Sequence, residues 1–489
     1  MKYQSTRSGY CVEDVKAVLD GIAPDGGLFV DPHLGEEPFD WENCLRLPPM
    51  EMAAKLLKQL LPGFGNMEAL VDRAYSGKFD TPELTPLVPV GESYALELFH
   101  GPTSAFKDVA LSVLPQLISA ARSQLHEKGE TLILTATSGD TGKAALEGFH
   151  DVPGTRIAVF YPEGGVSAVQ RKQMVTQEGR NVAVCAVRGN FDDCQRGVKQ
   201  AFAELRDCPE LRLSSANSIN IGRLAPQLVY YFIAYASLLE RKKIRLGDAV
   251  DFVVPTGNFG DILAGYMAKR LGLPVGKLVC ASNANRVLTD FFQTGIYDRR
   301  RSFCKTSSPS MDILVSSNLE RLLFYALDGD AADIRVCMEE LEEKGSYRLA
   351  EPVMDRLRCE FAAYCCSEED CTATIGKVYR ETGYVCDPHT AVGFFAAQQY
   401  RHDSKTKAPV VVLSTASPYK FPGAVLKALG GSIPEDEFEQ MDALHQMTGV
   451  PVPRNLASLR EKEDRHLDVI DKEEMNAYVL ELAKKEERP

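Results

Sequence analysis

Lys107 is the side chain in this sequence whose type and surroundings most clearly suggest chemistry. Apolar residues recur at steps of three and four over 106–121, which predicts one buried helix, apolar on both faces and capped by Thr103 or Ser104. Burial lowers the pKa of a lysine, and a neutral amine is a nucleophile that can form a Schiff base. A solvated Lys-Asp pair in a first helical turn is the alternative interpretation.

A glycine-containing turn, TGNFGD at 256–261, follows an apolar strand and opens a helix. Its two glycines let the backbone approach a ligand closely, and the free N–H groups at the start of a helix suit a phosphate. The turn therefore indicates a phosphate site. An ordinary tight turn is the alternative.

A second strand-to-helix turn, TATSGDTGK at 135–143, superficially resembles a nucleotide-binding P-loop. It lacks both the first glycine of that motif and the Ser or Thr that must follow the lysine, so the nucleotide interpretation fails. What remains is a hydroxyl-rich turn at a helix start, which favours binding of a carboxylate. Its polar residues are Thr137, Ser138, Asp140 and Thr141.

Two more polar groups are candidates for the same site. Arg223, in the segment NSINIGR, could bind a phosphate or carboxylate bidentately or could lie on the surface, with Asn217 and Asn220 as neutral polar neighbours. Thr415 follows an apolar strand, where a hydroxyl is commonly only a cap for the next turn. Together, a lysine, two anion cradles and a neutral hydroxyl indicate pyridoxal phosphate, whose aldehyde needs a lysine and whose phosphate needs a cradle.

The composition is that of a globular protein of more than one domain: 489 residues, 45% hydrophobic and 25% charged. A formal net charge of −13 argues against non-specific binding to nucleic acid or anionic membranes. The N-terminus has no apolar signal region, and we expect a cytoplasmic protein. Its 13 cysteines include no CxxC pair, and neither they nor the eight histidines show a metal-site spacing, so no metal is expected.

The elements that must position these residues alternate between strand and helix from residue 131 onward, which predicts parallel sheets covered by helices. Ligands bind at the carboxyl ends of strands in such sheets. The turns at 135–143 and 256–261, the segment NSINIGR and Thr415 all lie at such strand ends. The predicted domains are an N-terminal module at 1–90, a large cofactor-binding α/β domain at 91–125 and 221–430, a small α/β domain at 126–220 and a C-terminal helical extension at 431–489.

The motifs, taken in order, resemble the threonine synthase family of the bacterial and fungal type, within the fold-type II pyridoxal-phosphate enzymes. The resemblance runs nearly end to end and rests on STR, APDGGLF, GPTSAFKD, TSGDTG, NSIN, PTGNFGDILAGY, DPHTAV and KFP. It implies a two-lobed α/β fold like that of the tryptophan synthase β subunit, with helical N- and C-terminal extensions. The implied reaction converts O-phospho-L-homoserine and water to L-threonine and phosphate, and we expect a monomer or homodimer.

The resemblance also implies roles for individual residues. Lys107 matches the Schiff-base lysine and would act as the base. The implied cofactor-binding residues are Lys107, Asp140 near the 3-hydroxyl, Thr415 near the pyridine nitrogen, and the phosphate loop Gly257, Asn258, Phe259, Gly260 and Asp261. The expected substrate-binding residues are Thr137, Ser138 and Thr141 for the carboxylate, with Asn217, Asn220 and Arg223 for the phosphate. One departure is Ser417, where the family commonly has a histidine.

Two other functions compete with this interpretation. A threonine synthase-like lyase of the same fold would release phosphate but form 2-oxobutyrate. A non-catalytic relative would bind a phosphorylated ligand as a signal and would form no lysine imine. The product formed from O-phosphohomoserine distinguishes the first, and a borohydride-sensitive chromophore on Lys107 distinguishes the second.

Overall fold

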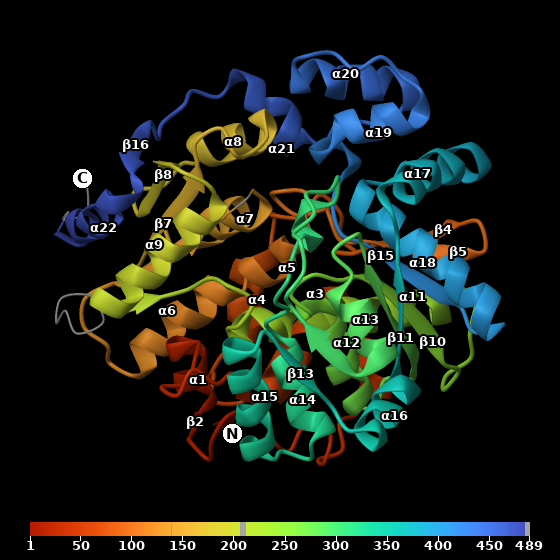
Figure 1. Cartoon of the computed structure of the whole chain (residues 1–489), viewed down its shortest axis with the longest axis horizontal. Coiled ribbons are helices and arrows are strands. Elements are labelled where there is room, and N and C mark those ends of the chain that lie inside the picture. The colour runs from red at the N-terminus through yellow and green to blue at the C-terminus, as the bar shows by residue number, and fades with distance from the viewer. Residues whose placement is uncertain (138, 206–211, 485–489) are drawn as a thin grey trace.

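The computed structural model describes residues 1–137, 139–205 and 212–484, and its main feature is a pair of α/β sheets (Figure 1). The larger sheet has six strands in the order β14-β11-β10-β15-β5-β4. All neighbours in it are parallel except β4 and β5, which are antiparallel. The strands are β14 (Phe361–Cys365), β11 (Val275–Ser282), β10 (Val250–Pro255), β15 (Val410–Ser414), β5 (Ser93–Glu97) and β4 (Leu87–Val90).

The smaller sheet has five parallel strands in the order β16-β8-β7-β6-β9. They are β16 (Asp468–Asp471), β8 (Val182–Arg188), β7 (Thr155–Pro162), β6 (Thr131–Ala136) and β9 (Arg212–Ser214). Two largely parallel sheets confirm the predicted two-lobed α/β fold. The predicted domain boundaries stay predictions.

Helices cover both sheets. In the larger one, α18 (Pro388–Ser404) packs along β10, β11, β14 and β15, while α12 (Gly260–Arg270) and α13 (Val287–Thr294) pack against β11. Every residue of β10 and β15 is buried, as expected for apolar strands covered on both faces. In the smaller sheet, α7 (Asp140–Phe149) packs against β7, and α9 (Phe191–Glu204) against β6 and β7.

The N-terminal segment contains more than helices. Strands β1 (Lys2–Ser5), β2 (Cys11–Glu13) and β3 (Phe29–Val30) form a small antiparallel sheet in the order β2-β1-β3. Its helices are α1 (Asp14–Asp20), α2 (Trp41–Cys44), α3 (Pro49–Leu60) and α4 (Met67–Tyr75).

The helix predicted over 106–121 is two helices, α5 (Lys107–Leu111) and α6 (Leu114–Gln124), so the prediction of one helix is wrong. Pro115, in the first turn of α6, has no N–H to donate, and its ring would clash with the carbonyl of Leu111 in a continuous helix. That carbonyl instead faces Gly148 of α7, where an added Cβ would lie 1.9 Å from the oxygen. The break therefore lets α5 and α7 approach closely.

The remaining helical elements connect and flank the sheets. Those before residue 330 are α8 (Ala168–Val175), α10 (Ile221–Leu224), η1 (Ala225–Gln227), α11 (Leu228–Glu240), η2 (Pro309–Met311) and α14 (Leu319–Ala326). Those after it are α15 (Ala331–Glu343), α16 (Glu351–Glu360), α17 (Glu368–Thr382), η3 (Pro418–Lys420) and α19 (Pro422–Leu429). Strands β12 (Ile296–Asp298) and β13 (Ser346–Arg348) pair antiparallel and form a separate two-stranded sheet.

The C-terminal segment from 431 contains α20 (Glu437–Thr448), α21 (Arg454–Ala457), η4 (Ser458–Glu461), η5 (Lys472–Glu474) and α22 (Met475–Lys484). It is not purely helical, because β16 pairs with β8 and becomes an edge strand of the smaller sheet. Figure 1 shows this blue segment beside the yellow β8 and α9. Hydrogen bonding to an existing sheet edge decides this structure, which the short segment DVID does not predict by itself.

Across the described residues, no helix combines the length and apolar character needed to cross a bilayer. The cysteines in that part of the chain are free thiols.

Candidate functional site

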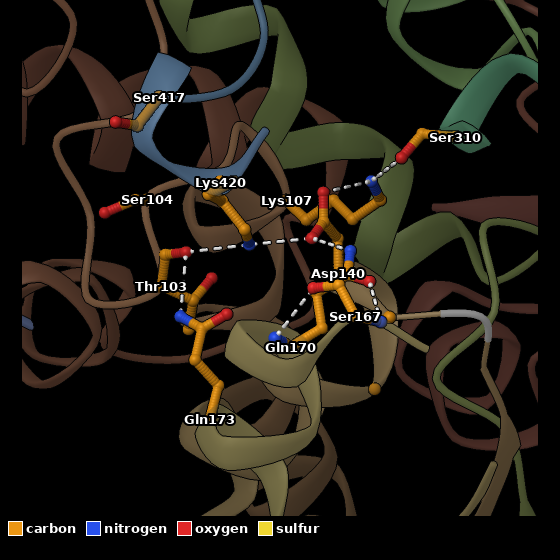
Figure 2. A network of polar contacts seen from close by, with 12 residues as sticks. Thr103, Ser104, Lys107, Asp140, Ser167, Gln170, Gln173, Ser310, Ser417 and Lys420 are labelled. Carbon is orange, nitrogen blue, oxygen red and sulfur yellow. Dashed lines mark hydrogen bonds and ion pairs between the residues drawn. The ribbon is translucent and has the colours of Figure 1, made fainter. Parts of the chain in front are cut away.

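The candidate site lies where strands of both sheets end. Lys107 lies in the connection that follows β5, the Gly257 turn follows β10, and Thr415 follows β15. Because these three strands are parallel, their carboxyl ends lie at one edge of the larger sheet. Asp140 comes from the end of β6 in the smaller sheet. Figure 2 shows Lys107 and Asp140 pointing toward one another across this junction.

Lys107 is buried, as its surroundings in the sequence predict. Its Nζ donates to Ser310 Oγ at 3.3 Å and lies 4.0 Å from Asp140 Oδ2. Burial lowers the pKa of Lys107 to about 8, although Asp140 opposes this shift. The cations Arg223 and Lys420 lower the pKa of Lys107 further. A substantial fraction of this lysine is therefore neutral near pH 8, as a nucleophile or base requires.

Asp108 organises the turn before Lys107, a role that its position in the sequence does not reveal. Its carboxylate accepts hydrogen bonds from the backbone N–H of Thr103 at 2.8 Å and from the Thr103 hydroxyl at 2.5 Å. The prediction of Thr103 or Ser104 as the helix N-cap is wrong, because the N-cap is Phe106 and no side chain caps this helix. The turn is closed by Asp108 reaching backward. Burial raises the pKa of Asp108 to about 6.

Ser104 is held in a left-handed conformation, with φ of 58°. A non-glycine residue adopts this conformation only when its surroundings hold it there. Asn455 of α21 supplies that support, because its Nδ2 donates to the carbonyl of Pro102 at 2.8 Å and to Ser104 Oγ at 2.9 Å. The backbone N–H of Ser417 donates to the carbonyl of Ser104 at 3.1 Å. The C-terminal segment therefore fixes the turn that presents Lys107.

Asp140 is contacted by two lysines and a glutamine. Lys420 Nζ lies 2.7 Å from its Oδ1, and Gln170 Nε2 donates to the same oxygen at 3.1 Å. Burial alone would raise the pKa of Asp140, but Lys420 and Lys107 outweigh burial and hold it well below its usual range. Asp140 is therefore an ionised carboxylate between two lysines, as Figure 2 shows.

The turn that precedes Asp140 is held together by the hydroxyl group of Thr137. Thr137 Oγ1 accepts from the backbone N–H groups of Gly139 and Gly142, at 3.0 and 2.9 Å, and donates to the carbonyl of Gly139. Its hydrogen-bonding capacity is thus engaged inside the turn. Thr141 is partly exposed in the first turn of α7, and Ser138 lies outside the described residues.

The turn after β10 is built in the opposite way. Phe259 has φ of 65°, and no side chain caps α12. The loop carbonyls are tied back, because Ser316 Oγ donates to Gly257 O at 2.7 Å and the Asn318 backbone N–H donates to Asn258 O at 3.0 Å. The N–H of Ile262 donates to Asp261 Oδ1 at 2.8 Å, so the N–H groups before it are the ones that could face an anion.

Asp261 is the acidic residue in the first turn of α12. Burial raises the pKa of Asp261 to about 7, against the hydrogen bond from the Ile262 N–H and the nearby Lys107. A carboxyl group that is largely protonated below pH 7 repels a phosphate much less than an ionised one would.

Arg223 is a buried guanidinium with no ion-pair partner in the part of the chain that the structure describes. Its Nη1 donates to the carbonyl of Ala216 at 2.5 Å, and burial lowers the pKa of Arg223 to about 10. The two neighbouring candidates differ from it. Asn220 is engaged, donating to Val18 O and accepting from the Gly222 N–H, both at 2.9 Å, and Asn217 is exposed.

Thr415 is buried directly after β15, and its carbonyl accepts from the Phe106 N–H at 2.8 Å. That bond ties the end of β15 to the residue before Lys107. Ser417, at the position where a histidine is common, accepts a hydrogen bond from the Tyr419 N–H and does not point to Lys107 in Figure 2.

Three site residues were not among the predicted ones. Ser310 contacts Lys107, and its backbone N–H donates to His389 Nε2 at 3.1 Å. His389 Nδ1 lies 2.6 Å from Asp387 Oδ2, which leaves Nε2 as the acceptor. Lys420 is the third. The motifs DPHTAV and KFP were the signals that could have found His389 and Lys420, whereas Ser310 lies in a segment with no motif.

These residues fit pyridoxal phosphate. Lys107 supplies a buried amine, and the uncapped start of α12 supplies a phosphate cradle. A side chain at Gly257 would not fit, because an added Cβ would lie 2.7 Å from the carbonyl oxygen of Ser310. Among the described residues, no cluster of three or more His, Cys, Asp or Glu side chains could hold a metal ion.

Two family models match the chain. The model described as "Pyridoxal-phosphate dependent enzyme" matches residues 80–416, and the one described as "Threonine synthase, C-terminal" matches residues 390–479. The first covers the six strands of the larger sheet and the turns that carry Lys107, Gly257 and Thr415. The second covers Asn455, which contacts Ser104.

Curated relatives and solved structures agree with these matches. Threonine synthase of Pseudomonas aeruginosa is 38% identical over 95% of both chains. Human threonine synthase-like 1 is 39% identical over 85% of this chain, and the match spans only 58% of that protein. The structure of threonine synthase from Brucella melitensis with bound PLP superposes with a TM-score of 0.88, 38% identity and coverage of 99% of this chain and 100% of that one. Yeast threonine synthase gives 0.88, 33% identity and 98% of both chains.

Proposed function

The chain belongs to the threonine synthase family of pyridoxal-phosphate dependent enzymes, and we propose that it converts O-phospho-L-homoserine and water to L-threonine and phosphate. The chain spans about three fifths of the length of the threonine synthase-like 1 relatives that it matches. Relatives named threonine synthase match it over nearly their whole length, which supports the biosynthetic reaction.

One observation carries the proposal: a buried lysine with a lowered pKa lies in the electrostatic reach of a buried guanidinium that has no carboxylate partner among the described residues. A buried cation without a partner is costly and marks the place where an anion belongs. The start of α12 can hold the phosphate of the cofactor. Arg223 would then be left for a second phosphate, that of the substrate.

The cofactor, when bound, supplies an electron sink that stabilises negative charge on substrate carbon. Lys107 would hold the cofactor through its amine, be displaced by the amine of the substrate, and then remove the proton from Cα. The same amine would move protons at Cβ, where water adds after phosphate leaves Cγ. Its neutral fraction near pH 8 suits a base.

Substrate groups would be held by separate parts of the site. Arg223 would bind the phosphate, because a guanidinium pairs with phosphate oxygens bidentately. Thr141 and the first turn of α7 would bind the carboxylate. The side chains of Thr137 and Asn220, already hydrogen-bonded within the protein, would shape these two turns. Asp140, Thr415 and the Gly257 loop would contact the cofactor. A cytoplasmic location and a monomer or homodimer complete it.

The test is to incubate the purified chain, loaded with the cofactor, with O-phospho-L-homoserine and to identify the carbon product. L-threonine and phosphate in equal amounts are expected. Formation of 2-oxobutyrate without threonine would favour the lyase instead. If no product forms and borohydride discharges no lysine-bound chromophore, the chain is a binding protein.

A variant sharpens the test. In Arg223→Met, we expect the KM for the phosphorylated substrate to rise by about tenfold or more, because one charge-assisted contact is lost, while cofactor affinity stays near that of the wild type. Inhibition by inorganic phosphate should weaken in parallel. If cofactor affinity falls as much as the KM for the substrate rises, Arg223 binds the cofactor phosphate and not the substrate phosphate.

A further inference from the structure

Lys420 is a second buried lysine beside Lys107, and the proposed reaction does not use it. Its side chain has no exposed surface, and its Nζ lies 2.7 Å from Asp140 Oδ1. Its Nζ also donates a hydrogen bond to the carbonyl of Thr103 at 3.0 Å. Two lysines from different strand-to-helix connections therefore share one carboxylate (Figure 2).

The two lysines share Asp140 unequally. The contact of Lys420 with the carboxylate is a hydrogen-bonded ion pair, whereas Lys107 stands 4.0 Å from the other oxygen. The attraction between charges grows as their separation shrinks, and a hydrogen bond adds to it. Gln170 also donates to the oxygen that Lys420 holds. The carboxylate is thus drawn toward Lys420 and away from Lys107.

The titratable and charged groups that face this pair come from α10, α18, α12 and α5. Arg223 on α10 acts on Lys107, and His389 on α18 acts on Asp140. Asp261 on α12 faces Lys107 as a weakened acid, and Asp108 on α5 faces Lys420. Near pH 8 these carboxyl groups are mostly ionised, but Asp140 is the one that lies within 4.0 Å of the Nζ atoms of both lysines among the described residues. Of the two amines that share it, the less well paired one loses its proton more readily, and that amine is Lys107.

We propose that Lys420 is a positioning residue that keeps the Asp140 carboxylate engaged and thereby leaves the Lys107 amine free to release its proton. Without Lys420, Lys107 is the one lysine left beside the Asp140 carboxylate among the described residues, and the two close into an ion pair that holds the proton on Lys107. This inference deepens the proposed function, because Lys107 is the residue that holds the cofactor and acts as the base there.

The test measures the protonation of Lys107 in the full chain from which the cofactor has been removed. An amine-reactive acylating reagent is applied in brief pulses from pH 6 to 10, and peptide mass spectrometry gives the labelling rate of Lys107 itself. The variants are Lys420→Met, Lys420→Arg, Asp140→Asn and the double variant Asp140→Asn with Lys420→Met. Circular dichroism verifies that each is folded.

In Lys420→Met, the midpoint of Lys107 labelling should move to higher pH, and the labelling rate below the midpoint should fall roughly tenfold for each pH unit of the move. Lys420→Arg keeps the charge and should keep the midpoint near that of the wild type. The double variant, which removes the carboxylate as well, should return the midpoint to or below the wild-type value.

An unmoved midpoint in a folded Lys420→Met chain overturns the proposal and makes Lys420 a merely structural residue. If Lys420→Met does not fold, Asp140→Asn decides, because the proposal requires its midpoint to move to lower pH, and an unmoved midpoint overturns it. The readout needs no substrate. A chain that shows these shifts but makes no threonine would refute the proposed function and leave this inference standing.

Discussion

Two strand-to-helix turns of this protein look alike in sequence but have opposite hydrogen-bonding patterns. The turn at 137–142 and the turn at 256–261 each follow an apolar strand, contain two glycines and place an aspartate in the first helical turn. In the first, Thr137 takes the backbone N–H groups of Gly139 and Gly142. In the second, side chains take the loop carbonyls, the N-cap residue makes no side-chain cap bond, and Asp261 accepts from the N–H of Ile262.

The aspartates of the two turns differ as well. Asp140 is held ionised by lysines, whereas burial raises the pKa of Asp261 to about 7. A phosphate near α7 would meet a fixed negative charge, and one near α12 would meet a weak acid. The phosphate site proposed at α12 thus combines loop carbonyls that are tied back with a first-turn carboxyl group that can lose its charge, and glycine spacing does not report either feature.

The largest effect is expected from Gly257→Ala. Its Cβ would lie 2.7 Å from the carbonyl oxygen of Ser310, a backbone atom that cannot rotate away, so the turn at 256–261 must shift. We expect cofactor affinity to fall by about 100-fold, measured by absorbance titration of the cofactor-free chain. Gly9→Ala, where an added Cβ meets nothing within 4 Å, is the control. Wild-type affinity in Gly257→Ala would remove the phosphate site from this turn.

The next effect is on the pH dependence of stability. The pKa of Asp261 is about 7 in the folded chain and lower in the unfolded one, so its contribution is fully present below the unfolded value and is lost as pH rises through 7. Relative to Asp261→Asn, the free energy of unfolding of the wild type should fall by about 2 kcal/mol between pH 5 and 7.5. Urea unfolding of the cofactor-free chains measures it, and parallel pH profiles would contradict the contrast with Asp140.

A smaller effect is expected at the other turn. Thr137→Val keeps the shape but removes the acceptor of two N–H groups, so we expect a loss of about 1 kcal/mol in the free energy of unfolding. Cofactor affinity should stay within about twofold of wild type, because we propose that the turn at 256–261 holds the cofactor phosphate. Thr135→Val is the matched control, since the Thr135 hydroxyl is buried without a hydrogen-bond partner in the described part of the chain. A large loss of cofactor affinity in Thr137→Val would erase the distinction between the turns.

The smallest effect concerns the hydrogen bond from Ser316 to the turn at 256–261. Ser316→Ala removes the hydrogen bond to Gly257 O, worth about 1 kcal/mol, and should weaken cofactor binding by roughly fivefold. The same titration measures it. Unchanged affinity would show that Asn318 alone holds the loop carbonyls.

Local signals were enough to predict the sheets, the buried Lys107 and the Gly257 turn, because strand periodicity and turn glycines act over a few residues. Lys420 and Ser310 could not be predicted in the same way. Their partners, Asp140 and Lys107, are 280 and 203 residues away in the chain, and only the folded sheets bring them together. The engagement of Thr137 inside its own turn depends on backbone geometry that composition does not reveal.

The bond between Asn455 and the Ser104 turn has a consequence for how the protein is made. The two residues are 351 positions apart, so a ribosome adding ~5–20 residues per second finishes Asn455 about 20 to 70 s after Ser104. Strand β8 likewise waits for β16 as its neighbour. The newly made chain therefore carries Lys107 on a turn that lacks this support, and leaves one edge of β8 unpaired, until residues 455 to 471 have been added.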